Sequence, residues 1–286
     1  MKGKIRKTIA YTLYIAGLAL FFLYVCFPEE TVSRYAEHRI SSTMPGLQAA
    51  VGAIRPGFPP SMVARDIQIR YNGSGPFLLE RLSLSPGYTG LVTAKPSFNV
   101  SSEAAGGTIR GSIATGQGSS GADLALELDL KDLRMEELNP VFREITNRSM
   151  EGRLEGRIDY TGSSDMNGIG SAVFTLRQGM LQLNQPLFGI EEIEFRQAEA
   201  ELKSENRRIE IPDFTLEGRQ FSADASGRIM LSAPVETSRI RMNAAVTLHP
   251  ALLKSIGGAL PGKYKGREEI PVQIAGTLGR PKISIR

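Results

Sequence analysis

Apolar and polar residues alternate along most of this chain, and this period of two constrains the fold more than any other feature. The strictest run, residues 122–130, places four leucines on one face and three carboxylates on the other. The leucines are Leu124, Leu126, Leu128 and Leu130. Because successive side chains of a strand point to opposite faces, the run predicts a strand with one dry face and one wet face. Such strands are typical of antiparallel sheets that bury only one side.

Similar runs recur from residue 47 onward, separated by Gly, Pro, Asn or Ser. They are residues 65–71, 77–84, 91–100, 107–113, 153–160, 171–176, 179–183, 193–202, 207–217, 221–231, 239–248, 270–278 and 282–285. The parity slips between Phe195 and Ala198, and a β-bulge near Gln197 would reconcile the two halves of that run. The pattern predicts a mainly β domain over residues 47–286, an antiparallel meander with a few short helices.

Two places interrupt the strands in the same way. Residues 131–145 read as a short helix after a strand, and residues 249–256 repeat this order later in the chain. A glycine-containing strand follows in each case. We therefore predict a degenerate repeat over residues 122–183 and 239–286, of the kind that builds stackable sheets.

The N-terminal segment has a different character. Residues 1–7 include four basic residues, residues 8–27 carry no charge, and Pro28, Glu29 and Glu30 follow. Apolar residues 8–27, at about 1.5 Å each, match the roughly 30 Å hydrocarbon core of a bilayer and predict a transmembrane helix. The basic flank places the N-terminus in the cytoplasm and the rest of the chain across the membrane. A cleaved signal peptide, or lipidation at Cys26, is the alternative, which the bulky residues before Pro28 disfavour.

Residues 28–46 are predicted to link this segment to the β domain. Apolar residues at helical spacing predict a helix over 29–44, which Pro45 and Gly46 end. It is either a surface helix that leaves the membrane or a helix that binds a partner.

The net positive charge of the chain comes from its N-terminal tail. The sequence has 34 basic and 30 acidic residues, and the four basic residues of the tail account for the whole net charge of +4. The exported part is therefore neutral overall, which disfavours nucleic-acid binding. Cys26 is the only cysteine, so the exported part has no disulfide.

The sequence offers few groups for catalysis. His38 and His249 are the only histidines, and each is better interpreted as a surface or capping residue than as a base or metal ligand. The densest carboxylate cluster is Glu191, Glu192 and Glu194, which a solvated sheet face explains better than a calcium site or an acid pair. We therefore expect a protein that is not an enzyme and that has no cofactor and no metal.

Three segments of the chain carry recognisable motifs. They are residues 27–30, Phe-Pro-Glu-Glu; residues 128–160, with Gly152, Leu154, Gly156 and Ile158 as a Gly-x-Leu-x-Gly-x-Ile motif; and residues 274–283, with the ending Gly276, Thr277, Leu278 and Pro281. Together they resemble the type II secretion system protein N family (GspN), in its longer, AsmA-like form. The resemblance covers nearly the whole chain, although its motifs are diffuse.

The resemblance implies an N-terminal transmembrane helix followed by an elongated, curled antiparallel β-sheet in the periplasm. The protein would be a non-enzymatic, single-pass inner-membrane component of the type II secretion machine, with a role in scaffolding or in secretin assembly. Its partners would be the inner membrane and other secretion-system subunits, the secretin among them. The resemblance supplies no functional residues.

A second interpretation is that the curled sheet forms an apolar trough that carries phospholipid between membranes, as AsmA-type proteins are thought to do. The row that would line the trough, or pack as an ordinary core, is Leu124, Leu126, Leu128, Leu130, Ile209, Ile211, Phe214 and Leu216, together with Phe221 and Ile229. Alternation alone does not separate a trough from a packed core. A passive envelope domain without cargo is the third interpretation.

Overall fold

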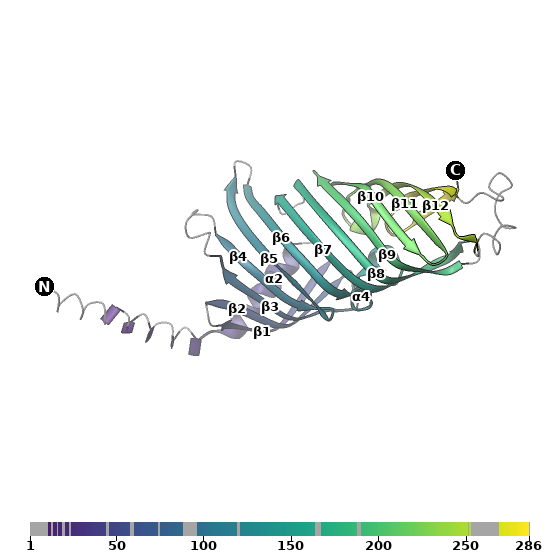
Figure 1. Cartoon of the computed structure of the whole chain (residues 1–286). Helices are drawn as coiled ribbons and strands as arrows, with labels where there is room; N and C mark the ends of the chain where they lie inside the picture. Colours follow the sequence, from purple (N-terminus) through teal and green to yellow (C-terminus); the bar gives the residue numbers. More distant parts are fainter. Residues whose placement is uncertain are drawn as a thin grey trace.

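The chain folds into one long antiparallel sheet in which every strand pairs with its neighbours in sequence (Figure 1). The computed structural model describes residues 11–285 except 13, 16, 19–20, 23, 44–45, 58–59, 74, 88–95, 119–120, 164–166, 188–189, 251 and 253–268. The 14 strands follow the order β1 to β14 without a crossover. The prediction of a mainly β, antiparallel meander is therefore confirmed.

The elements have the following bounds. The first six strands are β1 Leu47–Gly57, β2 Ser61–Tyr71, β3 Phe77–Pro86, β4 Ser97–Ala104, β5 Gly107–Gly118 and β6 Gly121–Arg134. The next four are β7 Met150–Gly162, β8 Gly168–Leu187, β9 Ile190–Glu205 and β10 Arg208–Gly218. The last four are β11 Phe221–Met230, β12 Arg239–Leu248, β13 Glu269–Thr277 and β14 Pro281–Ile285. The helices are α2 Glu29–Thr43, α4 Met135–Thr146 and the 3₁₀ turn η1 Val235–Thr237.

Two of the predicted helices are observed, and the other two lie partly outside the described residues. The helix expected over 29–44 is α2, and the helix expected within 131–145 is α4. The helix expected within 249–256 lies outside the described residues except for its first two residues and Leu252. The predicted transmembrane segment, residues 8–27, lies partly outside them, and no helix within the described part is long and apolar enough to cross a membrane. The transmembrane helix, the domain division and the degenerate repeat stay predictions.

One row of apolar residues crosses the whole sheet on one face. Directly opposed residues of neighbouring antiparallel strands share a face, so the pairings define this row from β1 to β14. Its members are Ile54, Ala64, Leu82, Ser102, Ile109, Leu130, Gly156, Phe174, Ala200, Phe214, Ala225, Ala244, Val272 and Ile285. The polar member, Ser102, is buried and donates a hydrogen bond to the Arg81 carbonyl at 2.9 Å. We call the face that carries this row the inner face.

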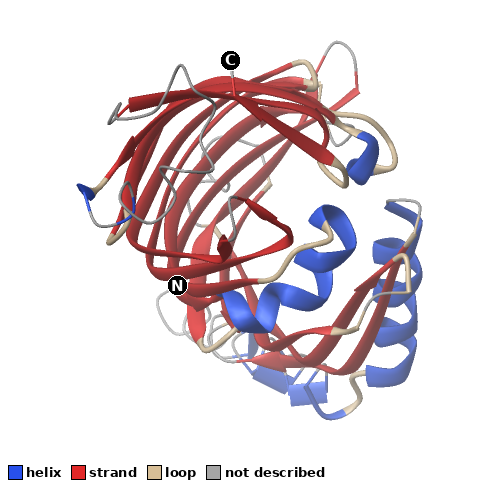
Figure 2. Ribbon diagram, turned by 90° about the vertical axis from the view of Figure 1, so that its right-hand side faces the viewer, coloured by secondary structure: helices blue, strands red, loops and turns tan. Residues whose placement is uncertain are grey.

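The adjacent row points to the opposite, outer face and is mostly polar. It includes Arg110, Asp129 and Arg157, which the pairings bring side by side, and Glu201, which follows beyond Val173. Figure 2 looks along the length of the sheet and shows the strands curling around an interior, with helices in and beside its opening. No second sheet of described residues covers the dry side of this sheet. The curl of the strands therefore shields the inner face from water.

Helix α2 covers the first strands and also occupies the free edge of β1. Val32 and Ala36 pack against the buried residues Val51 and Ile54 on the inner face. At the edge, the Val51 N–H donates to Glu37 Oε1 at 2.7 Å. The Ala49 N–H donates to Ser41 Oγ at 3.2 Å. Two amides that would otherwise be available to a further strand are thus satisfied by side chains one helical turn apart.

Helix α4 repeats this arrangement in the middle of the sheet. Strand β7 begins beyond the point where β6 ends, so its first amides have no strand partner on that side. The Gly152 N–H donates to Glu136 Oε1 at 3.1 Å, and the Met150 N–H donates to Asn139 Oδ1 at 2.9 Å. The left-handed Asn147 ends α4 and turns the chain back into β7.

Strand β8 corrects one prediction. Residues 171–176 and 179–183 were expected as separate strands, but both belong to the single strand Gly168–Leu187. Gly179 lies opposite Phe195, and a Cβ at this position would collide with the Phe195 ring. Glycine is therefore present to admit an aromatic ring across the ladder rather than to end the strand. The bulge predicted near Gln197 is confirmed, since Arg196 is the extra residue where β9 pairs with β10.

The edge contacts of α2 lead to a stability prediction. We expect Glu37→Ala to lower the free energy of unfolding by about 1.5–3 kcal/mol, because it removes a charge-assisted hydrogen bond from a backbone amide. Glu30→Ala is the control, since the described partner of Glu30 is the exposed Arg34 on the same helix, and its effect is expected to be much smaller. Chemical denaturation of the full chain measures both, and equal effects would contradict the role of Glu37 at the edge.

Candidate functional site

An apolar cavity of about 460 Å³ lies on the inner face, in the C-terminal half of the sheet. Of the 23 described residues that line it, 21 have apolar side chains, and Thr146 and Arg148 are the exceptions. A volume of this size lies within the range of about 300–1,000 Å³ that is usual for small-molecule sites. The cavity is therefore a candidate binding site for an apolar ligand.

Strands β11 to β13 form most of the cavity floor, and α4 closes one end. The strand residues include Phe221, Ala223, Ala225, Ile240, Met242, Ala244, Val246, Leu248, Ile270, Val272 and Ile274. At the end nearer the N-terminus, Phe142 of α4 lines the cavity and packs in a cluster with buried Met135, Leu176 and Phe195. Helix α4 thus separates the cavity from the apolar face of the earlier strands.

Small side chains explain why this part of the inner face is hollow. Ala225 lies directly opposite Ala244, and Ala223 lies opposite Val246. On the neighbouring strand, Phe214 lies opposite Ala225 and borders the cavity from the side. Side chains in a packed core interdigitate with few voids, so a row of alanines between larger residues leaves space that the fold does not fill by itself.

The charged group of the lining is at the turn between α4 and β7. Arg148 is half-buried, and burial lowers its pKa below the ordinary value of an arginine. The backbone around it is fixed, because the Asn147 N–H donates to the Arg143 carbonyl at 2.7 Å and the Gln182 N–H donates to the Ser149 carbonyl at 3.0 Å. Ser149 Oγ also donates to Gln182 Oε1.

The residues predicted for the trough or core take different positions. Phe214 and Phe221 line the cavity, whereas Leu216 packs in the α4 cluster and Ile211 is buried elsewhere on β10. Ile209 and Ile229 face each other, half-buried, on β10 and β11. The four leucines of β6, Leu124, Leu126, Leu128 and Leu130, are half-buried on the inner face and are not part of the cavity lining. Of the residues predicted for the trough or core, Phe214 and Phe221 line the candidate cavity.

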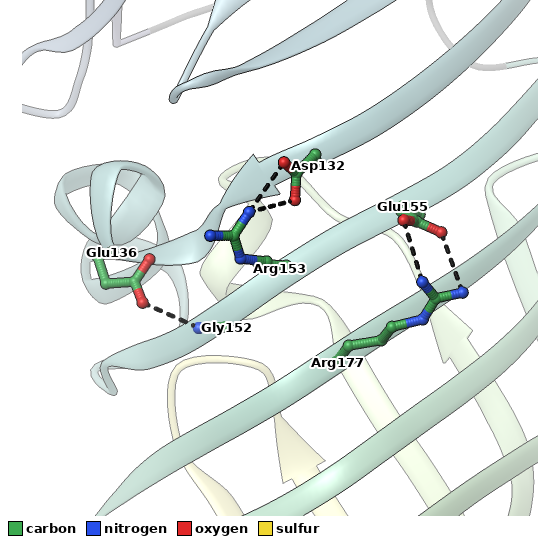
Figure 3. A network of polar contacts seen from close by, with 6 residues as sticks. All are labelled: Asp132, Glu136, Gly152, Arg153, Glu155 and Arg177. Atoms are coloured by element: carbon green, nitrogen blue, oxygen red, sulfur yellow. Dashed lines mark hydrogen bonds and ion pairs between the residues drawn. The ribbon is translucent and has the colours of Figure 1, made fainter.

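The outer face carries networks of polar side chains (Figure 3). Arg153 Nη1 contacts both carboxylate oxygens of Asp132, at 2.7 and 2.9 Å, and this contact raises the pKa of Arg153. Arg177 makes two contacts of 3.3 Å with Glu155. These side chains are about half exposed, so the networks are ladders of surface ion pairs across β6, β7 and β8.

The apolar clusters on the inner face can be tested by comparing the stability cost of truncating a leucine inside a cluster with that of truncating a leucine outside the clusters. We expect Leu216→Ala to destabilise the fold by about 2–4 kcal/mol, because it leaves a void beneath α4. Leu124→Ala, on the same face but outside the core clusters, is expected to cost roughly 1 kcal/mol. Urea unfolding of the full chain measures the difference. A cost for Leu124→Ala as large as that for Leu216→Ala would place the β6 leucines in an equally tight core.

Comparison with protein-family models, with curated proteins and with solved structures finds no match to this chain. The site is therefore interpreted from its own geometry. The resemblance to the type II secretion system protein N family stays an expectation, as do the partners and the location that it implies.

Proposed function

We propose that this domain binds the apolar chain of a lipid or a similar amphiphile in the cavity between α4 and strands β10–β14. The observation that carries the proposal is the lining, in which 21 of the 23 residues that the structure describes are apolar. Water in such a space finds few hydrogen-bond partners, whereas an apolar chain gains the free energy of transfer from water. The domain would act without catalysis.

The size of the cavity suits one acyl chain. The volume of about 460 Å³ lies within the range that is usual for small-molecule sites, so the cavity has room for an apolar chain. Each buried methylene contributes about 0.8 kcal/mol of transfer free energy.

The position of α4 suggests how the lipid is held. The helix packs on the inner face at β7–β10 and closes the cavity on that side. We propose that the domain holds a lipid at one end of the sheet and transfers it there, rather than passing it along the whole inner face. The predicted membrane segment, residues 8–27, would keep the domain beside the inner membrane from which the lipid is taken.

The proposal is tested by filling the cavity. Ala244→Phe places a six-carbon ring in the lining, and Ala245→Phe places the same ring on the outer face of the same strand. We expect the full chain, purified from membranes, to lose most of its extractable lipid with Ala244→Phe and to keep it with Ala245→Phe. Lipid per mole of protein is measured by mass spectrometry.

Thermal unfolding of both variants serves as the control for folding. Ala244→Phe occupies existing space, so its unfolding temperature should stay close to that of the wild type. A wild-type chain without bound lipid, or a folded Ala244→Phe variant with the wild-type amount, would reject the proposal.

The secretion-system role is the second candidate, and the free edge of the sheet favours it. Strand β14 pairs only with β13 among the strands described, whereas the edge of β1 is satisfied by α2. An open edge is a template for strand addition by another protein. A secretion subunit, such as a secretin, would add a strand there.

A photo-crosslinking residue at Lys282, exposed on β14, tests this second candidate. The same residue at Arg55, exposed on β1 at the opposite edge strand, is the control. We expect a crosslink to a secretion subunit from Lys282 alone. Crosslinks of equal yield from both positions, or none from Lys282, would count against strand addition at β14.

A further inference from the structure

Arg148 is the only charged residue among the described residues that line the cavity. It follows the C-terminal end of α4, where the helix dipole is negative, and it precedes β7. All of its lining neighbours except Thr146 are apolar. A cation at the border of an apolar space is unusual, because burial of a charge is costly unless the charge is paired.

No carboxylate among the described residues pairs with Arg148. The ion pairs that these residues form involve other arginines, namely Arg34, Arg55, Arg134, Arg153, Arg157, Arg177 and Arg208, and Lys203. Arg153 and Arg157 have a raised pKa because Asp132 and Asp159 bind them, whereas burial alone shifts Arg148, in the opposite direction. The guanidinium is desolvated without compensation from the described part of the chain.

The turn that carries Arg148 is fixed on both sides. Asn147 and Ser149 are held by the backbone hydrogen bonds to Arg143 and Gln182. The Thr146 hydroxyl donates to the Phe142 carbonyl at 2.8 Å, so its hydrogen is already engaged. A ligand would therefore meet an arginine on a rigid backbone, which lowers the entropic cost of binding.

We infer that the cavity takes an amphiphile with an anionic head group, whose phosphate or carboxylate oxygens bind the Arg148 guanidinium while its chain lies among Ala225, Ala244 and Val272. This inference rests on the proposed function and adds the class of head group. Guanidinium suits the role because its planar donors match two oxygens of a phosphate or carboxylate at once. The ligand supplies the anion that the described lining lacks.

The experiment uses the full chain in a neutral detergent, after removal of copurified lipid. Dodecanoate, dodecyl phosphate and dodecanol share one chain and differ only in the head, and native mass spectrometry counts the bound molecules. The wild type should bind both anions more tightly than the alcohol. Arg148→Met should lower the affinity for both anions by roughly tenfold or more, as expected for the loss of a charge-assisted hydrogen bond. It should leave the affinity for dodecanol unchanged.

Arg143→Met is the matched control, because Arg143 is an exposed arginine on α4 that does not line the cavity. Its affinities should equal those of the wild type. Arg148→Lys keeps the charge without the planar fork and should bind the anions with intermediate affinity. The anion that binds more tightly identifies the preferred head group as phosphate or carboxylate.

The outcomes separate this inference from the proposed function. Equal affinity of the wild type for all three ligands would overturn the anion site and leave the apolar site intact. If a folded Arg148→Met variant lost affinity equally for dodecanol and for the anions, Arg148 would contribute only to packing, and the inference would be overturned. Absence of binding for every ligand would overturn both proposals.

Discussion

A single sheet of 14 strands has to keep one whole face out of water without a second sheet to cover it. The other features of the fold follow from this constraint. The strands curl so that the inner face shields itself (Figure 2), and three local clusters complete the burial. One lies under α2, one under α4, and one around Leu248, Leu252 and Ile270. Between the last two clusters the cover is incomplete, and there the cavity lies.

Much of the fold was predictable because its signal is local. Alternation fixes which side chains share a face, and it located β12 with its observed bounds and the bulge at Arg196. The prediction of two separate strands within β8 was wrong, because a glycine can either end a strand or make room for a side chain of the neighbouring strand. A glycine that ends a strand and one that admits Phe195 across the ladder look the same in the sequence, and only the pairing register separates them.

The site was predictable only in part, for a physical reason. Periodicity is carried by large apolar residues, and these fill space, as Leu216 does beneath α4. A cavity is produced by the small members of the same row, such as Ala225 and Ala244, whose hydrophobic signal is weak. Arg148 lies in a turn, outside every periodic run, and its relation to strands β11–β13 depends on how α4 returns the chain to the sheet. A search for opposed alanines within an otherwise bulky apolar row would have pointed to this region.

The two edges of the sheet are not equivalent, and this gives the molecule a direction. Glu37 and Ser41 occupy the outward amides of β1, while β14 has a neighbour on one side only among the described strands. Copies stacked head to tail would need β14 of one to join β1 of the next, and the side chains of α2 block that join. Contact through β14 alone is isologous and closes after two molecules. Because α2 already engages two amides of β1, the fold disfavours an open-ended fibre built by pairing one sheet edge with the other.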